Sequence, residues 1–353
     1  MVPQRDGVGT KAGTRLARWL GGAGLALVLA AGGCAPDRSE VTLTPEAQRE
    51  LKLRALNLLL AAAESELDDL SCNAIEALTR IAPRDGLPMF RKATESASPI
   101  VRYAGFRALG DARDSASMPR MLAAAKDDSA QVRLAAAYAL ARCGEQQHAR
   151  ALVHALTDSP DEKLRAEAAG LLGRLEEPRA VKPLRAALHY PINTKSVHVT
   201  LAIQAALAAL GDGEGLRELV NQAQGAPEAR SIALLLLADL GKPEAADALR
   251  YRLAGAKTEY EEARLIAARG LGRLGSSEGY KFALRMATWT DPNKHPTAEN
   301  PERTFPMRSL AVHALAEIGD PRALPVLRDI AAAPGNPRLQ VAAAYAICRI
   351  VRH

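Results

Sequence analysis

Apolar residues recur along this chain with the spacing of a helix, and nearly the same helix is written many times. The stretch VRLAAAYALARCG, which runs from Val132 to Gly144, places its apolar residues on one helical face and ends at a glycine, a common helix stop. Related stretches begin at Leu70, Val101, Leu164, Val199, Ala229, Ala263, Met307 and Leu339. Most of them are about 30 to 35 residues apart, a period that is typical of a solenoid.

A second helix is predicted before each copy. Turns such as the Asp-Pro at Asp320 and the Glu-Pro at Glu177 supply a cap and a first helical turn, and apolar residues follow them at helical spacing. No alternating strand pattern of useful length accompanies them. The pattern therefore predicts an all-α fold of about nine antiparallel helix pairs, which must stack because one pair cannot bury its own apolar face.

The repeated residues resemble the HEAT repeat, in particular the short bacterial type first noted in phycobilisome lyases. The residues that carry the resemblance are a Gly-Asp-Pro-Arg-Ala turn, residues 319–323, and the Val/Leu-Arg-x-x-Ala-x-x-Ala-Leu-x-x-Leu-Gly helix, over roughly residues 44–353. The resemblance implies a right-handed α-solenoid, and nine pairs at about 10 Å each predict a curved rod of about 90 Å. The last helix, with Val341 and Ile347, lacks the polar face of an end repeat, so we expect it to pair with another end.

The first 34 residues read as an export signal rather than as part of the fold. A basic start and an apolar run of about 15 residues, too short to span a bilayer, lead to Ala-Gly-Gly-Cys at Cys34. This ending resembles the lipobox of bacterial lipoproteins, in which the cysteine is diacylated and becomes the first mature residue. We therefore expect a signal peptide over residues 1–33, lipidation of Cys34, a linker over residues 34–43, and a solenoid over residues 44–353. The alternatives are a secreted protein cut nearby and an uncleaved anchor.

Charge and cysteine usage exclude several classes of function. Removing residues 1–33 lowers the formal net charge from +6 to about +3, so we expect no nucleic-acid partner. Cys72, Cys143 and Cys348 lie far apart within helical patterns, and no CxxC or zinc spacing occurs. We expect them to be buried free thiols and expect neither a structural metal nor a haem.

An arginine follows the first apolar residue of most copies, as in Arg102 and Arg133, and acids such as Asp127 and Asp158 come a few residues earlier. HEAT-type solenoids are similar in using an Asp and an Arg near this turn to link repeats. We therefore expect these arginines to be structural and to form a ladder between repeats; the alternative is a series of unlinked surface charges.

Candidate binding residues lie on the exposed side of the repeated helix, which the resemblance places on the concave face. Two positions four residues apart share this side and hold seven arginines and two tyrosines against four acids. Arginine and tyrosine are enriched at protein interfaces. The predicted partner-binding strip consists of Arg107, Tyr138, Arg142, Arg174, Arg269 and Arg273. The alternative is an ordinary solvated helical face.

Two interruptions break the period, over residues 190–198 and 289–306. Insertions in solenoids form loops on one edge, which is often a binding edge. Trp289 is a candidate anchor for recognition by the longer insertion. Asp291, His295 and Glu299 have side chains of metal-ligating types, but their Pro-rich loop lacks a known ligand spacing, so a surface loop without metal is the favoured interpretation.

The function that these observations favour is a lipid-anchored, non-enzymatic scaffold that binds a protein partner in the bacterial cell envelope. We expect an exported protein, facing the periplasm on the inner or the outer membrane, with no cofactor and no small-molecule substrate. The alternative is a HEAT-like lyase or another accessory subunit of an enzyme that acts on an exported protein. The resemblance to HEAT-repeat deoxyhypusine hydroxylases does not extend to iron binding, because the chain has no His-Glu dipeptide.

Overall fold

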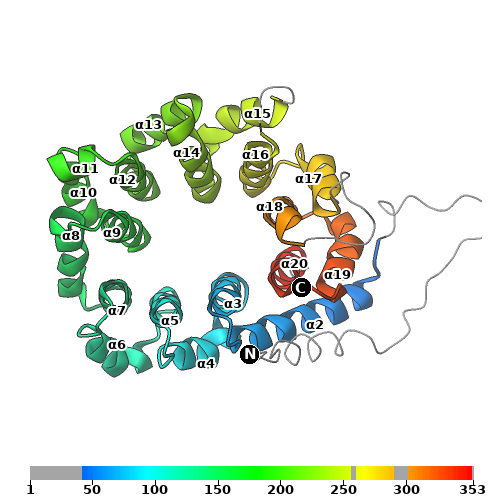
Figure 1. Ribbon diagram of the computed structural model, residues 1–353, viewed down its shortest axis with the longest axis horizontal. Helices are drawn as coiled ribbons and strands as arrows, with labels where there is room; N and C mark the ends of the chain where they lie inside the picture. Colours follow the sequence, from blue (N-terminus) through cyan, green and yellow to red (C-terminus); the bar gives the residue numbers. More distant parts are fainter. Residues whose placement is uncertain (1–41, 256–259, 290–300, 352–353) are drawn as a thin grey trace, which may run out of the picture.

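The computed structural model describes residues 42–255, 260–289 and 301–351 and consists of helices arranged in two layers (Figure 1). Residues 1–41 lie outside the described residues, and with them the predicted signal peptide, the predicted lipidation site Cys34 and most of the linker. The candidate ligands Asp291, His295 and Glu299 lie outside them as well. Within the described part, nine outer and nine inner helices alternate along the chain, which confirms the prediction of an all-α solenoid of nine pairs.

The outer layer precedes the inner layer in every repeat. The outer helices are α2 (Pro45–Ala63), α4 (Pro83–Ala93), α6 (Met118–Ala124), α8 (Ala149–Asp158), α10 (Val181–Ala187), α13 (Gly213–Gln224), α15 (Ala246–Ala254), α17 (Tyr280–Ala287) and α19 (Leu324–Ala332). The inner helices are α3 (Asp68–Ile81), α5 (Pro99–Asp111), α7 (Ala130–Arg142), α9 (Glu162–Arg174), α12 (Val197–Ala209), α14 (Pro227–Leu240), α16 (Glu261–Arg273), α18 (Pro301–Ile318) and α20 (Pro337–Ile350).

Local sequence explains where the inner helices begin and end. Side chains of Ser129, Asp161 and Ser196 cap three of them by accepting a hydrogen bond from a backbone N–H of the first turn. Most of the described inner helices end at a turn residue with a left-handed backbone, which is usually a glycine such as Gly144 at φ 108°. The sequence period is therefore also the period of caps and stops.

Adjacent inner helices touch through very small residues near their carboxyl ends. A Cβ atom built on Gly110 would lie 2.8 Å from Cα of Ala139, and one on Gly173 would lie 2.7 Å from Cα of Ala206. A Cβ atom built on Gly272 would likewise lie 2.6 Å from the backbone nitrogen of Ile318. The backbones of neighbouring repeats are in direct contact, which any larger side chain at these positions would prevent.

The arginines that follow the first apolar residue are structural, as predicted, and some of those in the described residues form the predicted links between repeats. Arg102 does pair with Asp127 of the next repeat, with Nη2 and Oδ1 2.9 Å apart. Arg133, in contrast, donates to the carbonyl oxygens of Asp127 and Asp128, and Asp158 pairs with His154. Arg165 and Arg230 likewise donate to carbonyl oxygens in the loop before their own inner helix. Arg264 and Arg308 donate to carbonyl oxygens at the end of the preceding outer helix. A carbonyl at a helix end carries partial negative charge, so it can replace the expected carboxylate.

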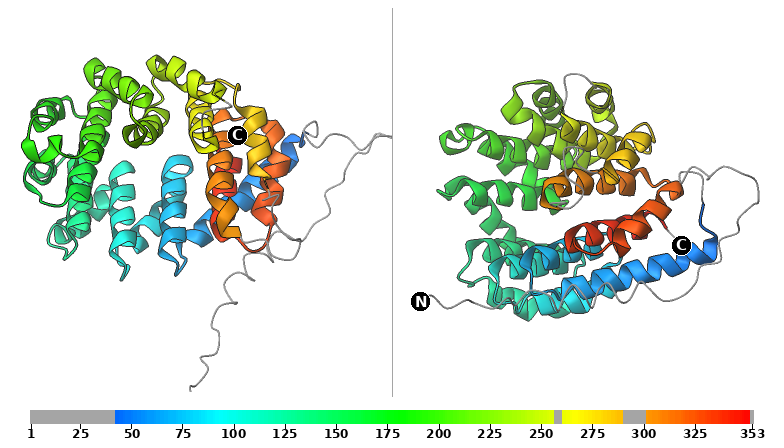
Figure 2. Two further views of the ribbon diagram at one scale, coloured as in Figure 1. Left: turned by 45° about the horizontal axis from the view of Figure 1, so that its top comes forward. Right: turned by 45° about the vertical axis from the view of Figure 1, so that its right-hand side comes forward.

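The solenoid is a closed ring and not the open curved rod that the repeat predicts. The last inner helix, α20, packs against α2 and α3 of the first repeat, so that the red and blue ends of the chain meet in Figure 1, and the right-hand view of Figure 2 shows α2 running beside α20. Arg338 forms an ion pair with Asp69, and Sγ of Cys348 lies 3.7 Å from the carbonyl oxygen of Lys52. We call this contact between the first and the last repeat the seam.

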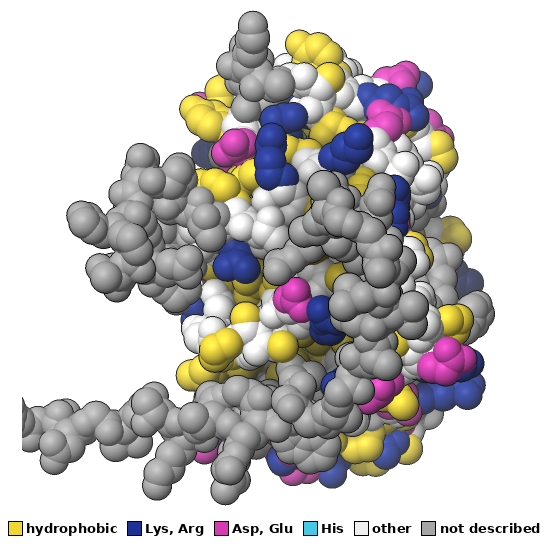
Figure 3. Space-filling view, turned by 90° about the vertical axis from the view of Figure 1, so that its right-hand side faces the viewer, with side chains coloured by type: hydrophobic (Ala, Val, Ile, Leu, Met, Phe, Trp, Pro, Cys, Tyr) yellow, Lys and Arg dark blue, Asp and Glu magenta, His cyan; other side chains and the backbone are white. Residues whose placement is uncertain are grey.

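The seam is apolar, which explains the composition of the last helix. Almost every residue from Leu339 to Ile350 is buried. The apolar residues of this stretch belong to one hydrophobic cluster with residues of α2 and α3 such as Leu59 and Ile75. The expectation that α20 pairs with another end is met within the same chain. Figure 3, which looks at the side of the ring with the last repeats, shows basic, acidic and hydrophobic side chains of described residues interspersed.

Both interruptions of the period are smaller than they look in the sequence. Residues 190–198 contain the short helix α11 (Pro191–Thr194), which the buried side chain of Asn193 ties to Arg165 and to the carbonyl of Leu156. The longer insertion ends earlier than residue 306, because α18 already begins at Pro301. A proline inside α18, Pro306, accounts for the loop-like appearance of that stretch in the sequence.

Candidate functional site

Three residues of the predicted strip come together where α5, α7 and α9 end. The hydroxyl of Tyr138 donates a hydrogen bond to the carboxylate of Asp111, which Nη1 of Arg174 also approaches to 3.7 Å. Nη1 of Arg142 lies 2.8 Å from Oε2 of Glu176, in the turn after α9. These residues, together with Arg113 in the turn after α5, form what we call the rim cluster: Asp111, Arg113, Tyr138, Arg142, Arg174 and Glu176.

Burial and pairing fix the charges of the rim cluster. Burial acts to lower the pKa of Arg142, but the hydrogen bond with Glu176 and the charges of the surrounding groups together outweigh it, and the pKa is raised. The same bond lowers the pKa of Glu176. Burial, followed by the neighbouring Asp111, raises the pKa of Tyr138, so the phenol remains a donor at neutral pH. The cluster therefore combines guanidinium groups with the ionised carboxylate of Glu176.

Two members of the rim cluster have a strained backbone. Arg113 has φ 53° and Glu176 has φ 58°, and they are the non-glycine residues with positive φ in the described part of the chain. Each stands at the turn position that glycine occupies in neighbouring repeats, for example Gly144 and Gly211. A side chain in this conformation costs about 1 kcal/mol relative to glycine, and strain of this kind concentrates at functional sites.

A second contact joins α5 to α9 across α7. The hydroxyl of Tyr103 donates a hydrogen bond to the carboxylate of Glu167, and burial raises the pKa of that carboxyl group. Neither residue belongs to the predicted strip, although both lie on the same side of their helices. Together with the contact between Arg174 and Asp111, this bond connects repeats that are not sequence neighbours.

The remaining members of the strip lie apart from the rim cluster. Nη2 of Arg107 approaches Oε2 of Glu76 to 3.4 Å. Arg269 pairs with Asp239 on the other side of the ring, where Arg273 lays its aliphatic part against Gly241. The strip is thus divided by its ion pairs, because most of its arginines pair with different acids.

The repeat geometry agrees with a comparison of sequence families. A family model described as HEAT repeats matches residues 56–141, 118–195 and 256–348, which is more than half of the chain. The chain is a HEAT-repeat protein. Among curated proteins, none matches this sequence.

Two solved structures resemble this HEAT-repeat protein. One is the complex of CpcE and CpcF of phycocyanin lyase from Nostoc sp. PCC7120, with 19% sequence identity, a TM-score of 0.38, and 81% of this chain and 98% of that chain covered. The other is human deoxyhypusine hydroxylase in complex with glycerol, with 20% identity, a TM-score of 0.36, and 78% and 99% covered. Neither similarity is high enough to indicate a shared activity.

The remaining candidate residues in the described part of the HEAT-repeat protein are a tryptophan and three cysteines. Trp289 is half-buried and packs against the hydrophobic core beside α17. Cys348 is buried, Cys72 and Cys143 are half-buried, and all three are free thiols. Among the residues that the structure describes, no group of three His, Cys, Asp or Glu side chains is placed to hold a metal ion. None of the described helices is both long and apolar enough to cross a bilayer.

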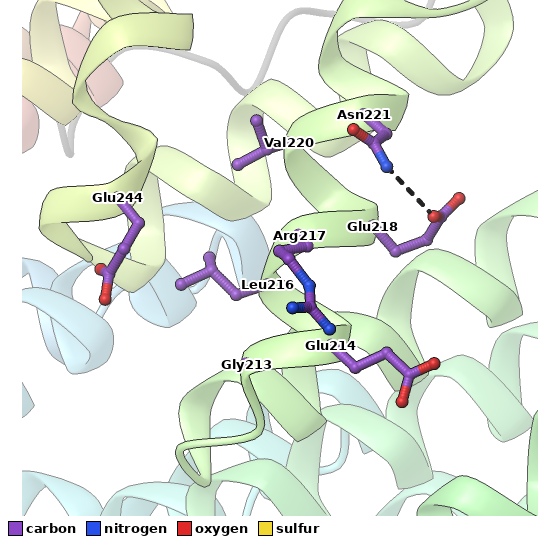
Figure 4. A pocket seen from close by; sticks show the side chains of 8 residues that line it. All are labelled: Gly213, Glu214, Leu216, Arg217, Glu218, Val220, Asn221 and Glu244. Carbon is purple, nitrogen blue, oxygen red and sulfur yellow. Dashed lines mark hydrogen bonds between the residues drawn. The ribbon is translucent and has the colours of Figure 1, made fainter.

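An open depression of about 480 Å³ lies on the outer layer, along α13 (Figure 4). Glu214, Glu218 and Glu244 line it together with Arg217 and the apolar Leu216. A hydrogen bond of 3.5 Å links Asn221 to Glu218 at its edge. The lining has no histidine, cysteine or hydroxyl group, and its ionisable side chains are three glutamates and one arginine.

His313 on α18 is expected to make stability depend on pH. Burial, followed by Arg269 and Arg80, lowers its pKa to about 4, although Glu76 and Glu317 act in the opposite direction. The unfolded chain binds a proton near the ordinary histidine pKa and the folded chain does not. Stability is therefore complete well above pH 6.5 and falls by about 3 kcal/mol as the pH drops to 4.

Urea unfolding of the wild type and of His313→Gln at pH 7, 6, 5 and 4.5 checks this expectation. The variant should lose less stability than the wild type over this range, because glutamine does not titrate. Equal pH profiles of the two proteins would show that His313 protonates normally in the folded state.

Proposed function

We propose that this HEAT-repeat protein is a lipid-anchored, non-enzymatic scaffold that binds a protein partner in the bacterial cell envelope. The export signal and the Ala-Gly-Gly-Cys ending at Cys34 support the anchor and the location. The linker of about nine residues reaches at most about 30 Å, so the ring would stay close to the membrane. Repeat solenoids provide extended binding surfaces, which supports the scaffold role.

The observation that carries the proposal is the rim cluster. Its arginines project from the ends of rigid, mutually packed helices, and the side chains of Arg113 and Arg174 remain 62% and 45% exposed. Exposed arginine next to tyrosine on a preorganised surface is the composition of a protein-binding hot spot. Its arginines and tyrosine therefore support binding.

Capture from envelope membranes tests the scaffold. We expect cross-linking and pull-down with the wild type to recover one dominant protein, and the double variant Arg142→Glu, Arg174→Glu to recover at least about tenfold less. Arg250→Glu is the matched control, because Arg250 is a half-exposed, ion-paired arginine on the outer helix α15. Circular dichroism of each variant shows that the ring is folded. Undiminished capture by the folded double variant would exclude the rim cluster as the binding surface.

Metabolic labelling tests the anchor separately. A clickable fatty acid should label the wild type and should not label Cys34→Ala, which we expect to leave the membrane fraction. Cys72, Cys143 and Cys348 remain in the variant and serve as an internal control for unspecific acylation. Equal labelling of the two proteins would contradict lipidation at Cys34.

A further inference from the structure

The two strained residues of the rim cluster are partners of each other. Nη2 of Arg113 lies 3.6 Å from Oε2 of Glu176, although the two residues belong to repeats that are separated by α7. Both side chains therefore reach over the end of α7 from opposite sides. The glycine that neighbouring repeats use at this turn position, as in Gly144, would relieve the strain and would remove the ion pair.

Arg142, which ends α7, is held in place beneath this pair. Its side chain is only 10% exposed, and its Nη1 also approaches the carbonyl oxygens of Arg174 and Leu175 to 3.4 Å. Nε of the same guanidinium is buried without a hydrogen-bond partner. Arginine binds a carboxylate best through two parallel hydrogen bonds, and Glu176 uses one donor of Arg142.

Glu176 itself is loosely held. Its side chain is 70% exposed, and its carboxylate contacts are those with Arg142 and Arg113. A carboxylate of another molecule that approached from solvent would meet the same two guanidinium groups, with Arg174 beside them. The neighbouring carboxylate of Asp111 favours a singly charged group over a phosphate, because a second negative charge would be repelled more strongly.

We propose that Glu176 occupies the place of a carboxylate of the partner, so that the rim cluster binds an acidic protein segment and Glu176 is displaced when that segment binds. The inference rests on the proposed protein-binding function and names the chemistry of the partner. It also explains why strained, charged residues stand where glycine would be the more stable choice. While the partner is absent, Glu176 remains paired with Arg113 and Arg142.

Fluorescence anisotropy with a labelled peptide of alternating glutamate and glycine, about ten residues long, tests the displacement. With the full chain in detergent, we expect Glu176→Gln to bind the peptide about three- to tenfold more tightly than the wild type, because the internal competitor is gone. Glu176→Gly should bind at least as tightly as Glu176→Gln. A peptide with glutamine in place of glutamate should not bind, and free acetate at the same carboxylate concentration should not compete.

Glu177→Gln is the matched control, since Glu177 lies in the same turn but faces Arg179. An unchanged affinity in Glu176→Gln, or an equal gain in Glu177→Gln, would overturn the inference. Competition by acetate would assign the site to small carboxylates in place of a peptide, which also contradicts it. If the protein captures an envelope partner but Glu176→Gln does not change peptide affinity, the scaffold proposal stands and the displacement of Glu176 is excluded. If peptide affinity increases but no envelope partner is captured, the displacement stands and the scaffold proposal is excluded.

Discussion

Replacing Cys348 with aspartate is expected to open the ring and to lower the free energy of unfolding by about 3–5 kcal/mol. The thiol is buried in the seam against the backbone carbonyl of Lys52, and burial raises its pKa to about 12. An aspartate there would bring a buried negative charge against a carbonyl oxygen, and the charge of Lys52 acts on this position less strongly than burial does. Urea unfolding measures the loss of stability, and small-angle scattering measures the radius of gyration, which should increase when the seam separates.

Cys143→Asp is the control for this variant. Cys143 is half-buried at the end of α7, away from the seam, so its replacement should cost less and should leave the radius of gyration unchanged. A Cys348→Asp protein that keeps both the stability and the dimensions of the wild type would mean that α20 does not pack against α2 in solution.

Replacing Gly173 with leucine is expected to destabilise the protein by about 3 kcal/mol or more. The backbone of α12 lies against Gly173, with only 2.7 Å between the site of a Cβ and Cα of Ala206. A side chain there must push two inner helices apart, and this displacement would spread to the rim cluster at the end of α9. Thermal unfolding measures the effect.

Alanine variants at two glycines of α9 make a matched pair. Gly173→Ala should destabilise the protein, because its methyl group would meet backbone. Gly170→Ala should stabilise it by about 0.5–1 kcal/mol, since no atom lies within 4 Å of the new methyl group and alanine favours the helix. The close contact between α9 and α12 would be refuted if both alanine variants were stabilised alike.

The sequence predicts each repeat well and the whole ring poorly, for a physical reason. Apolar spacing and helix stops such as Gly144 are local properties, so they reveal the nine helix pairs and the small residues between them. Curvature is the sum of small rotations between successive repeats, and no single residue encodes it. The closure at Cys348 and Lys52 therefore appears only when all repeats are placed.

The candidate site was also predictable in part. The strip residues Tyr138, Arg142 and Arg174 do share the inner side and meet in the rim cluster. Glu176, the acidic partner of Arg142, was missed, because it comes from the turn and not from the helix face. A signal for it exists in the sequence, since Arg113 and Glu176 interrupt the run of glycines at the turn position.

Closure of the ring also changes how this HEAT-repeat protein is expected to unfold. An open array has two weak terminal units, each with a neighbour on one side, and unfolding usually proceeds inwards from them. Here the terminal helices α2 and α20 cover one another, so each repeat has neighbours on both sides. Unfolding from the ends must first break the seam. The amide hydrogens of the terminal helices α2 and α20 should therefore exchange with solvent as slowly as those of interior repeats.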